Sequence, residues 1–173
     1  MDRQADQEFR GWALASRGGL RRTAFLLSGD WFLADDLVQD ALIRIYGVWP
    51  RVERSGDVGA YARRVLVNLY LDYRRRPWRR ERPTDQIPDR ATPADDGVGD
   101  RDKLLAALRQ VPPRQRAVLV LRFWEDLSIA QTANTLGTSA GNVKSQTSRG
   151  LTALRAALVE RGLPTTFNYQ EQP

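Results

Sequence analysis

The sequence predicts an all-α protein made of two small helical domains joined by a flexible linker. Apolar residues recur with helical spacing along most of residues 8–76 and 103–161, and no segment shows a convincing strand pattern. Prolines at positions 77, 83, 88 and 93 lie between these two blocks, in a stretch that is rich in Asp and nearly free of large apolar residues. Such a stretch cannot bury enough surface to offset the entropy lost on ordering, which predicts a boundary there.

Composition excludes several classes of function. The chain has 173 residues, a net charge of +6, and neither His nor Cys. Disulfides, thiolate metal sites and His-based catalytic triads are therefore ruled out, and only carboxylates remain to bind zinc. We expect no cofactor, no metal and no catalytic residue. No apolar run approaches the roughly 20 residues that cross a bilayer, and the polar N-terminus lacks a signal-peptide pattern, so we expect a cytoplasmic protein without membrane contact.

The charge is unevenly distributed along the chain. Residues 1–73 are neutral overall, residues 74–83 carry +5, residues 84–102 carry −4, and residues 103–173 carry +5. Of the 27 basic residues, 25 are Arg, whose planar guanidinium suits phosphate and guanine. This distribution favours an anionic partner such as nucleic acid.

In the first block we expect helices at residues 8–28, 34–49 and 58–76, with a charged loop at 51–57. Gly18 and Gly19 could divide the first helix in two, and Pro50 is expected to end the second. In the third helix Val67 and Leu71 fall outside the apolar stripe, which indicates that this helix is packed on more than one side.

In the second block we expect helices at residues 102–110, 113–124, 128–136 and 139–161. Ser128 and Gln131 form a capping-box pattern, and Gly137 suits the left-handed position that ends a helix. Together with a small Ala133 and an apolar Val143, this spacing is typical of a helix-turn-helix over residues 128–155. An ordinary helical hairpin with a Gly stop is the alternative.

The second helix of this motif has a polar outer face without acidic residues. The face comprises Asn142, Lys144, Ser145, Gln146, Ser148, Arg149 and Thr152. Asn142, Gln146 and Arg149 are the side chains best able to contact base edges. The lysine and the hydroxyls are better suited to phosphates, which position a helix without recognising sequence. The face therefore predicts binding of duplex DNA.

Two surfaces of the first block are ambiguous. On the helix at 34–49, Asp36, Gln39, Asp40 and Ile43 point away from the apolar stripe, which fits either a protein-binding surface or an ordinary solvated face.

The helix at 58–76 carries Arg63, Arg64, Arg74, Arg75 and Arg76, interleaved with Tyr61, Tyr70 and Tyr73 and followed by Trp78. Basic and aromatic side chains together bind single-stranded nucleic acid by stacking. Tyr61 and Tyr73 also fit the helix core.

The two blocks together resemble the extracytoplasmic-function (ECF, group IV) sigma factors of bacterial RNA polymerase, and among them the actinobacterial sigma-E-like members. Four segments carry the resemblance: residues 35–41 (DDLVQDA), 61–75, 111–124 and 141–151. Two positions depart from the family pattern, because Asn142 stands where Thr is usual and Gly150 where Ala is usual. Gly costs roughly 1 kcal/mol of helix stability relative to Ala.

The resemblance implies a domain organisation. Residues 1–80 would form a region 2 domain that binds core polymerase and melts and recognises the −10 element. Residues 81–102 would form the linker, residues 103–162 a region 4 domain that recognises the −35 duplex, and residues 163–173 a flexible tail. The partners implied are core RNA polymerase, through its β′ clamp helices and β flap, promoter DNA and an anti-sigma factor, with no small-molecule substrate.

The resemblance also assigns residues to each partner. Polymerase contacts fall on Asp36, Leu37, Gln39, Asp40 and Ile43; −10 DNA contacts on Arg64, Asn68, Arg74 and Arg75; and −35 contacts on Asn142, Lys144, Ser145, Gln146, Ser148 and Arg149. Asn68 stands where the family recognises an extruded base, which requires a pocket with hydrogen-bonding groups.

Two other functions compete with this hypothesis. The chain could be a stand-alone helix-turn-helix regulator whose first block binds a ligand or dimerises. It could also be an enzyme that uses Asp35, Asp36 and Asp40, with Mg²⁺, but Asp36 and Asp40 lie one turn apart on a helix face rather than converging in a pocket.

Overall fold

The computed structural model describes residues 3–76 and 98–163, and within these ranges every regular element is helical. The helices are α1 (Arg3–Ser28), α2 (Trp31–Gly47), α3 (Trp49–Arg54), α4 (Val58–Arg75), α5 (Val98–Gln110), α6 (Pro113–Leu119), the π-helical segment η2 (Val120–Trp124), α7 (Ile129–Leu136) and α8 (Ala140–Val159). The all-α prediction is confirmed. Most of the predicted linker and tail, and Trp78, lie outside the described residues.

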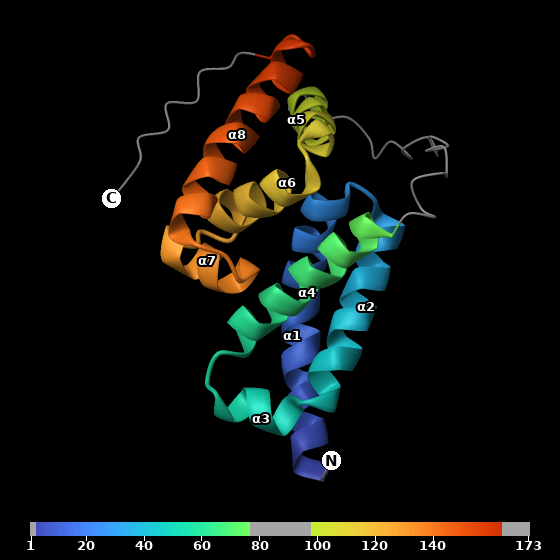
Figure 1. Ribbon diagram of the computed structural model, residues 1–173. Coiled ribbons are helices and arrows are strands. Elements are labelled where there is room, and N and C mark those ends of the chain that lie inside the picture. The colour runs from blue at the N-terminus through green and yellow to red at the C-terminus, as the bar shows by residue number, and fades with distance from the viewer. Residues whose placement is uncertain (1–2, 77–97, 164–173) are drawn as a thin grey trace.

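In the first block α1, α2 and α4 pack side by side, with the short α3 across one end (Figure 1). α1 runs unbroken through Gly18 and Gly19, so these glycines do not divide it. α2 begins at Trp31, three residues earlier than predicted, because the Asp30 side chain accepts hydrogen bonds from the Phe32 and Leu33 backbone N–H groups at 2.7 and 3.3 Å. An aspartate in this position caps a helix and favours its start.

Pro50 has a different role from the one predicted. α2 has already ended at Gly47, and Pro50 lies in the first turn of α3, which continues to Arg54. Proline is well tolerated there, because first-turn N–H groups have no intrahelical partner. The predicted charged loop at residues 51–57 is therefore mostly helix.

The second block holds the helix-turn-helix where it was predicted. Both halves of the capping box are present between Ser128 and Gln131, and Gly137 adopts the left-handed conformation with φ 61°. The Ser139 side chain caps α8. Val143 is fully buried between the two helices, as expected for the residue that fills their angle. α5 begins at Val98 rather than at residue 102, so the last residues assigned to the linker are helical.

The predicted helix at residues 113–124 is divided into two parts. α6 ends at Leu119, and η2 follows with wider turns, which close when Glu125 N–H donates to the Val120 carbonyl at 3.0 Å. Just beyond η2, Leu127 N–H donates to the Leu121 carbonyl at 3.0 Å. The chain then turns through Asp126, a non-glycine residue with φ 52°.

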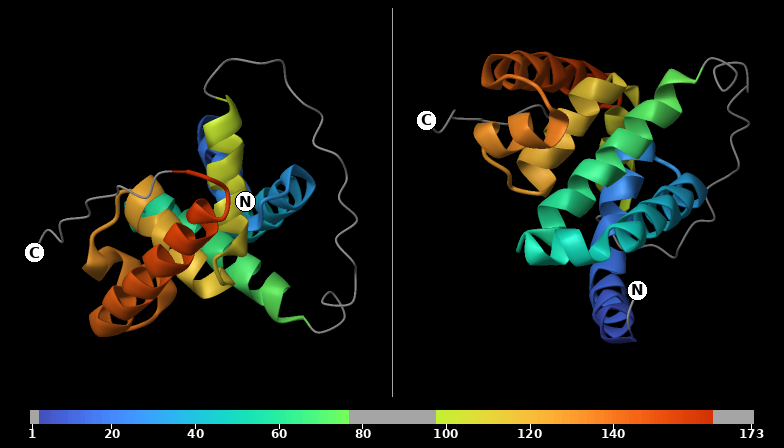
Figure 2. Two further views of the ribbon diagram at one scale, coloured as in Figure 1. Left: turned by 90° about the horizontal axis from the view of Figure 1, so that it is seen from above. Right: turned by 60° about the horizontal axis from the view of Figure 1, so that its bottom comes forward.

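The two blocks share one hydrophobic core. A single cluster of buried side chains contains Leu27, Val67 and Tyr70 from the first block and Ala117 and Leu121 from the second. The second block lies along α4 and the C-terminal part of α1, with α6 and α7 next to α4 (Figures 1 and 2). In this structure the predicted domains are therefore in direct contact.

Gly150 is buried where α8 crosses α6. A Cβ added there would lie 3.1 Å from Leu119 Cγ and 3.3 Å from Gln115 Cβ, so the absence of a side chain allows the two helices to approach closely. This contact gives a packing reason for the departure at position 150.

We expect Gly150→Val to lower the free energy of unfolding by about 1–3 kcal/mol, because the added atoms overpack the α6–α8 crossing. Gly19→Val is the matched control, since Gly19 also lies inside a helix but has no atom within 4 Å of an added Cβ. Urea denaturation of both variants measures the difference. Equal effects at the two sites would contradict the packing explanation.

Candidate functional site

The exposed face of α2 carries four of the five residues assigned to a protein partner. Asp36, Gln39 and Asp40 are exposed, and Ile43 is 63% exposed. Leu37 is only 3% exposed and belongs to the core, so it supports this face from beneath and borders the groove between α2 and α4. The reason is its place on the helix, one turn before Ala41 on the buried side.

A groove of about 670 Å³ lies between α1 and α2 beside this face. Its apolar lining includes Leu14, which is 79% exposed, together with Ile43. Arg10 and Arg17 also line it. The sequence pattern does not reveal this groove, because Leu14 lies off the apolar stripe of its own helix and is brought beside α2 only by packing.

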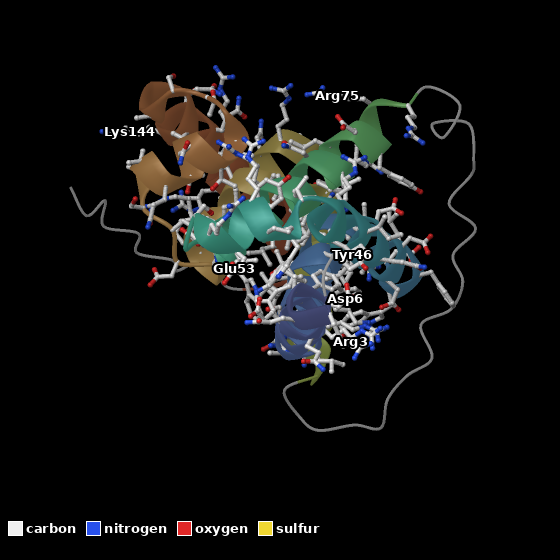
Figure 3. All side chains as sticks on the ribbon, turned by 90° about the horizontal axis from the view of Figure 1, so that it is seen from below. Arg3, Asp6, Tyr46, Glu53, Arg75 and Lys144 are labelled. Carbon is white, nitrogen blue, oxygen red and sulfur yellow. The ribbon has the colours of Figure 1, made fainter. Side chains whose placement is uncertain are left out.

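One wall of the groove is fixed by contacts between α1 and α2. Tyr46 donates a hydrogen bond to Asp6 at 2.9 Å, which raises the pKa of Tyr46, and its ring packs edge-on against Phe9 with the centroids 5.0 Å apart. Figure 3 shows Asp6 and Tyr46 next to each other near the start of α1. The groove therefore has a preformed shape.

A second set of contacts holds the other end of the two helices. Arg21 forms a two-point ion pair with Asp35 at 2.6 and 3.0 Å, which holds the pKa of Asp35 below its usual range, and its guanidinium lies 4.3 Å from the Trp31 ring centroid. Trp31 in turn stacks on Phe25. Asp35 is thus occupied by a structural pair. Within the described residues there is also no group of three His, Cys, Asp or Glu side chains that could hold a metal ion.

A polar groove of about 280 Å³ lies on the other side of the α2 face, between α2 and α4. Asp36, Gln39 and Asp40 line it from α2, and Asp72 from α4. Gln39 borders both grooves. The predicted contact residues therefore form a ridge with a groove on each side.

The residues of α4 assigned to single-stranded DNA share one face only in part. Arg64, Asn68 and Arg75 follow helical spacing and all are exposed, whereas Arg74, also exposed, points elsewhere around the helix. Arg64 is already engaged, because its Nη2 donates to the Asn134 carbonyl and, at 3.2 Å, to the Asn134 Oδ1 on α7.

The adjacent face of α4 packs against the second block. Arg63, Val67 and Tyr70 lie on it; Arg63 is 3.8 Å from Glu125, and Val67 and Tyr70 are fully buried. This confirms that α4 is packed on more than one side. It also shows that Tyr70 is enclosed in this arrangement and is not available there for stacking on bases.

Further polar contacts join the blocks near the end of α1. Arg116 on α6 is 4% exposed and its Nη1 donates to the Leu27 carbonyl at 2.8 Å. The Thr23 hydroxyl donates to the Glu125 carboxylate. These residues come from segments about 90–100 positions apart.

The predicted DNA face of α8 stays open in this arrangement. Asn142, Lys144, Ser148 and Arg149 are exposed, and Ser145 and Gln146 are half-buried. All six lie in the N-terminal half of the helix, after the capped turn. The helix end that enters a major groove in such motifs is therefore accessible. No described helix has the length and hydropathy needed to span a membrane.

Comparison with known proteins assigns both blocks. A family model described as "Sigma-70 region 2" matches residues 13–80, and one described as "Sigma-70, region 4" matches residues 101–154. The RNA polymerase sigma-E factor of Streptomyces coelicolor is 41% identical over 159 residues, covering 90% of this chain and 89% of that protein. The chain belongs to the ECF RNA polymerase sigma factors.

Two further similarities agree with this assignment. The ECF sigma factor SigL of Mycobacterium tuberculosis is 35% identical over 153 residues, covering 83% of this chain and 85% of that protein. A co-crystal structure of the sigma factor RpoE with the anti-sigma factor NepR from Bartonella quintana matches with a TM-score of 0.71 at 26% identity, covering 88% of this chain and 98% of that one.

The similarity to actinobacterial sigma-E proteins confirms the resemblance on which the sequence assignment was based. This sigma factor directs promoter-specific transcription initiation. Because the region 2 match covers the first block, the alternative of a stand-alone helix-turn-helix regulator loses its support.

The buried Tyr70 hydroxyl has no hydrogen-bond partner, and burial raises its pKa. We expect Tyr70→Phe to keep or raise the free energy of unfolding at pH 7, by up to about 1 kcal/mol, because it removes an unsatisfied polar group. A group whose pKa is higher in the folded than in the unfolded protein favours the folded state at pH values below its unfolded-state pKa, which is near 10 for Tyr. This contribution to stability is lost as the pH rises above that value. The wild type should therefore lose stability faster than Tyr70→Phe above about pH 10.

Denaturant unfolding from pH 7 to 11 measures both effects. Tyr46→Phe is the matched control, because it removes a hydroxyl that does have a partner, Asp6, and it should not raise stability. A Tyr70→Phe variant that is clearly less stable than wild type at pH 7 would show that the Tyr70 hydroxyl is satisfied.

Proposed function

We propose that the ridge on α2, formed by Asp36, Gln39, Asp40 and Ile43, binds the β′ clamp helices of core RNA polymerase. The observation that carries this proposal is the position of the ridge between two grooves, with exposed Ile43 and Leu14 on its apolar side and carboxylates on the other. An exposed apolar surface rimmed by charge is typical of a protein-binding site. Leu14 extends the contact surface onto α1.

We propose that the exposed face of α4 captures melted −10 DNA. Arg64 and Arg75 supply positive charge on either side of Asn68 along the helix, and the Asn68 amide supplies the hydrogen-bonding group that recognition of an unstacked base requires. Arg74 is better placed for the phosphate backbone than for the same base, because it points away from Asn68.

The outer face of α8 is proposed to bind the −35 duplex. Asn142, Gln146 and Arg149 would contact base edges, while Lys144, Ser145 and Ser148 would contact phosphates. The face contains no acidic residue, so the negative DNA backbone meets no like charge.

The domain organisation follows the same scheme. Residues 1–80 would act as the region 2 domain, 81–102 as linker, 103–162 as the region 4 domain that also meets the β flap, and 163–173 as tail. The chain would act in the cytoplasm with core polymerase and would leave catalysis to it. Because the similar RpoE structure contains an anti-sigma factor, an anti-sigma protein is a proposed partner here too.

This function requires the two blocks to separate. Arg64 cannot bind Asn134 and DNA at once, and the −10 and −35 elements lie far apart on a promoter, whereas α4 and α7 are in contact. We therefore propose that this arrangement is a closed state, held by Arg116, Arg64 and the contacts of Glu125 with Thr23 and Arg63, and that it opens when polymerase and promoter bind.

Asp40→Arg is expected to reduce core-polymerase binding by at least tenfold and to abolish promoter-specific run-off transcription, because it reverses charge on the ridge. Its circular dichroism spectrum and unfolding midpoint should match wild type, since Asp40 is exposed. Glu53→Arg is the control, because it makes the same acid-to-Arg charge reversal at an exposed position on α3. This variant should transcribe normally. Unchanged core affinity in Asp40→Arg would refute the ridge assignment.

Covalent closure should block transcription reversibly. The chain has no Cys, so Arg63→Cys/Glu125→Cys places two unique thiols at a contact between the blocks where both positions are only half-buried and a reagent can reach them. Joining them with a short, reducible bis-maleimide should abolish run-off transcription, and cleaving the cross-link should restore it. Each single-Cys variant with the same reagent is the control. Full activity of the intramolecularly cross-linked chain would show that opening is not required.

A further inference from the structure

The first turn of α8 presents an asparagine whose amide is held from one side. Asn142 Nδ2 donates to the Thr138 hydroxyl oxygen at 2.8 Å, across the turn of the helix-turn-helix. Asn142 is exposed and Thr138 is half-buried. The bond therefore orients a side chain that faces solvent at the end of the helix proposed to enter the major groove.

The equivalent position in α7 shows that this arrangement is not ordinary capping. Gln131 is the third residue of α7, and its Oε1 accepts a bond from Ser128 N–H at 2.8 Å, so its side chain serves its own helix cap. Asn142 is the third residue of α8, where Ser139 caps its backbone N–H at 3.1 Å. The Asn142 side chain turns instead to Thr138.

The backbone around this pair is rigid and its surroundings are open. Thr138 N–H donates to the Ala133 carbonyl at 3.0 Å in the turn that ends α7, and Val143 N–H donates to the Ser139 carbonyl at 3.0 Å. The residues before Asn142 are Ala140 and Gly141, and a Cβ added at Gly141 would meet only Ser139 Oγ, at 4.0 Å. Because Asn142 is itself exposed, a base edge can approach its amide.

The bond to Thr138 decides which atoms of the amide remain for DNA. A primary amide has one acceptor oxygen and two N–H donors. With one N–H held by Thr138, the oxygen and one N–H are left. In the major groove adenine offers the N7 acceptor and the N6 donor, which match this pair, whereas guanine offers two acceptors, N7 and O6. Guanine would place O6 against the amide oxygen.

We propose that the Thr138–Asn142 pair selects adenine over guanine at one position of the −35 element, with Thr138 as a positioning residue for Asn142. This inference rests on the proposed binding of −35 DNA by α8. Without the Thr138 hydroxyl, the Asn142 amide can rotate and offer both N–H groups to guanine, so the selectivity for adenine falls while binding of DNA in general persists.

The test uses the full chain with its cognate core polymerase on a promoter library with a randomised −35 element, in which each −35 variant is linked to a known barcode in the transcribed region. Sequencing the barcodes in the run-off transcripts reports the base preference at each −35 position. Asn142→Ala first identifies the position that this side chain recognises, as the one where base preference is lost. Thr138→Val should lower the adenine-to-guanine ratio at that same position about tenfold, the size expected for one two-point contact. Preferences at other positions should stay as in wild type.

Two further variants distinguish a positioning role of the Thr138 hydroxyl from a general effect on the structure of the helix-turn-helix. Thr138→Ser keeps the hydroxyl and should keep the wild-type ratio. Thr135→Val removes a hydroxyl on α7 that bonds only within its own helix, to the Gln131 carbonyl at 2.8 Å, and should leave all base preferences unchanged. The proposal is supported if the adenine-to-guanine ratio falls in Thr138→Val and stays at the wild-type value in Thr138→Ser.

A wild-type adenine-to-guanine ratio in Thr138→Val would overturn the proposal. An equal loss of base preference at every −35 position, in both Thr138→Val and Thr135→Val, would overturn it too. Unchanged preferences in Asn142→Ala would overturn it as well, while leaving the sigma-factor function intact. Failure of the wild-type chain to transcribe any library member would overturn the proposed function and this inference with it.

Discussion

The arrangement of the whole molecule depends on the buried guanidinium of Arg116. It donates to the Leu27 carbonyl near the end of α1 and to the Arg109 and Val111 carbonyls at the end of α5. The last carbonyls of a helix have no partner within it and carry the negative end of its dipole. One positive, forked side chain thus satisfies the ends of two helices and ties α6 to both.

This bond sets the packing of the second block on the first. With α6 fixed at the end of α1, η2 places Glu125 beside Thr23 and Arg63, and α7 reaches Arg64 on α4. Burial lowers the pKa of Arg116 because it disfavours the charged form. When the blocks part, Arg116 loses the Leu27 carbonyl and regains hydration, which offsets part of the free-energy cost of exposing the shared apolar core.

Closure affects the two proposed DNA surfaces differently. The face of α8 stays exposed in the closed arrangement, whereas Arg64 on α4 is occupied by Asn134 and Tyr70 is enclosed. The ridge on α2 lies away from the contact between the blocks, because both grooves beside it are lined by residues of the first block. A closed chain would therefore still present its polymerase surface and its duplex-binding helix, and contact between the blocks would chiefly withhold the single-strand surface.

The sequence by itself determined the all-α class, the family, and the helix-turn-helix with its Ser128–Gln131 cap and its turn at Gly137. These features depend on helical periodicity and on hydrogen bonds between residues three or four positions apart, which a local pattern records. The exposure of Asp36, Gln39, Asp40 and Ile43 followed from the same periodicity, as did the extra packed face of α4 at Val67. Only the tertiary structure decided what covers that face, why Leu14 joins Ile43 in one groove, and why position 150 has no side chain. Each of these depends on contacts between segments distant in sequence, and a local pattern carries no record of which distant partner a side chain will meet.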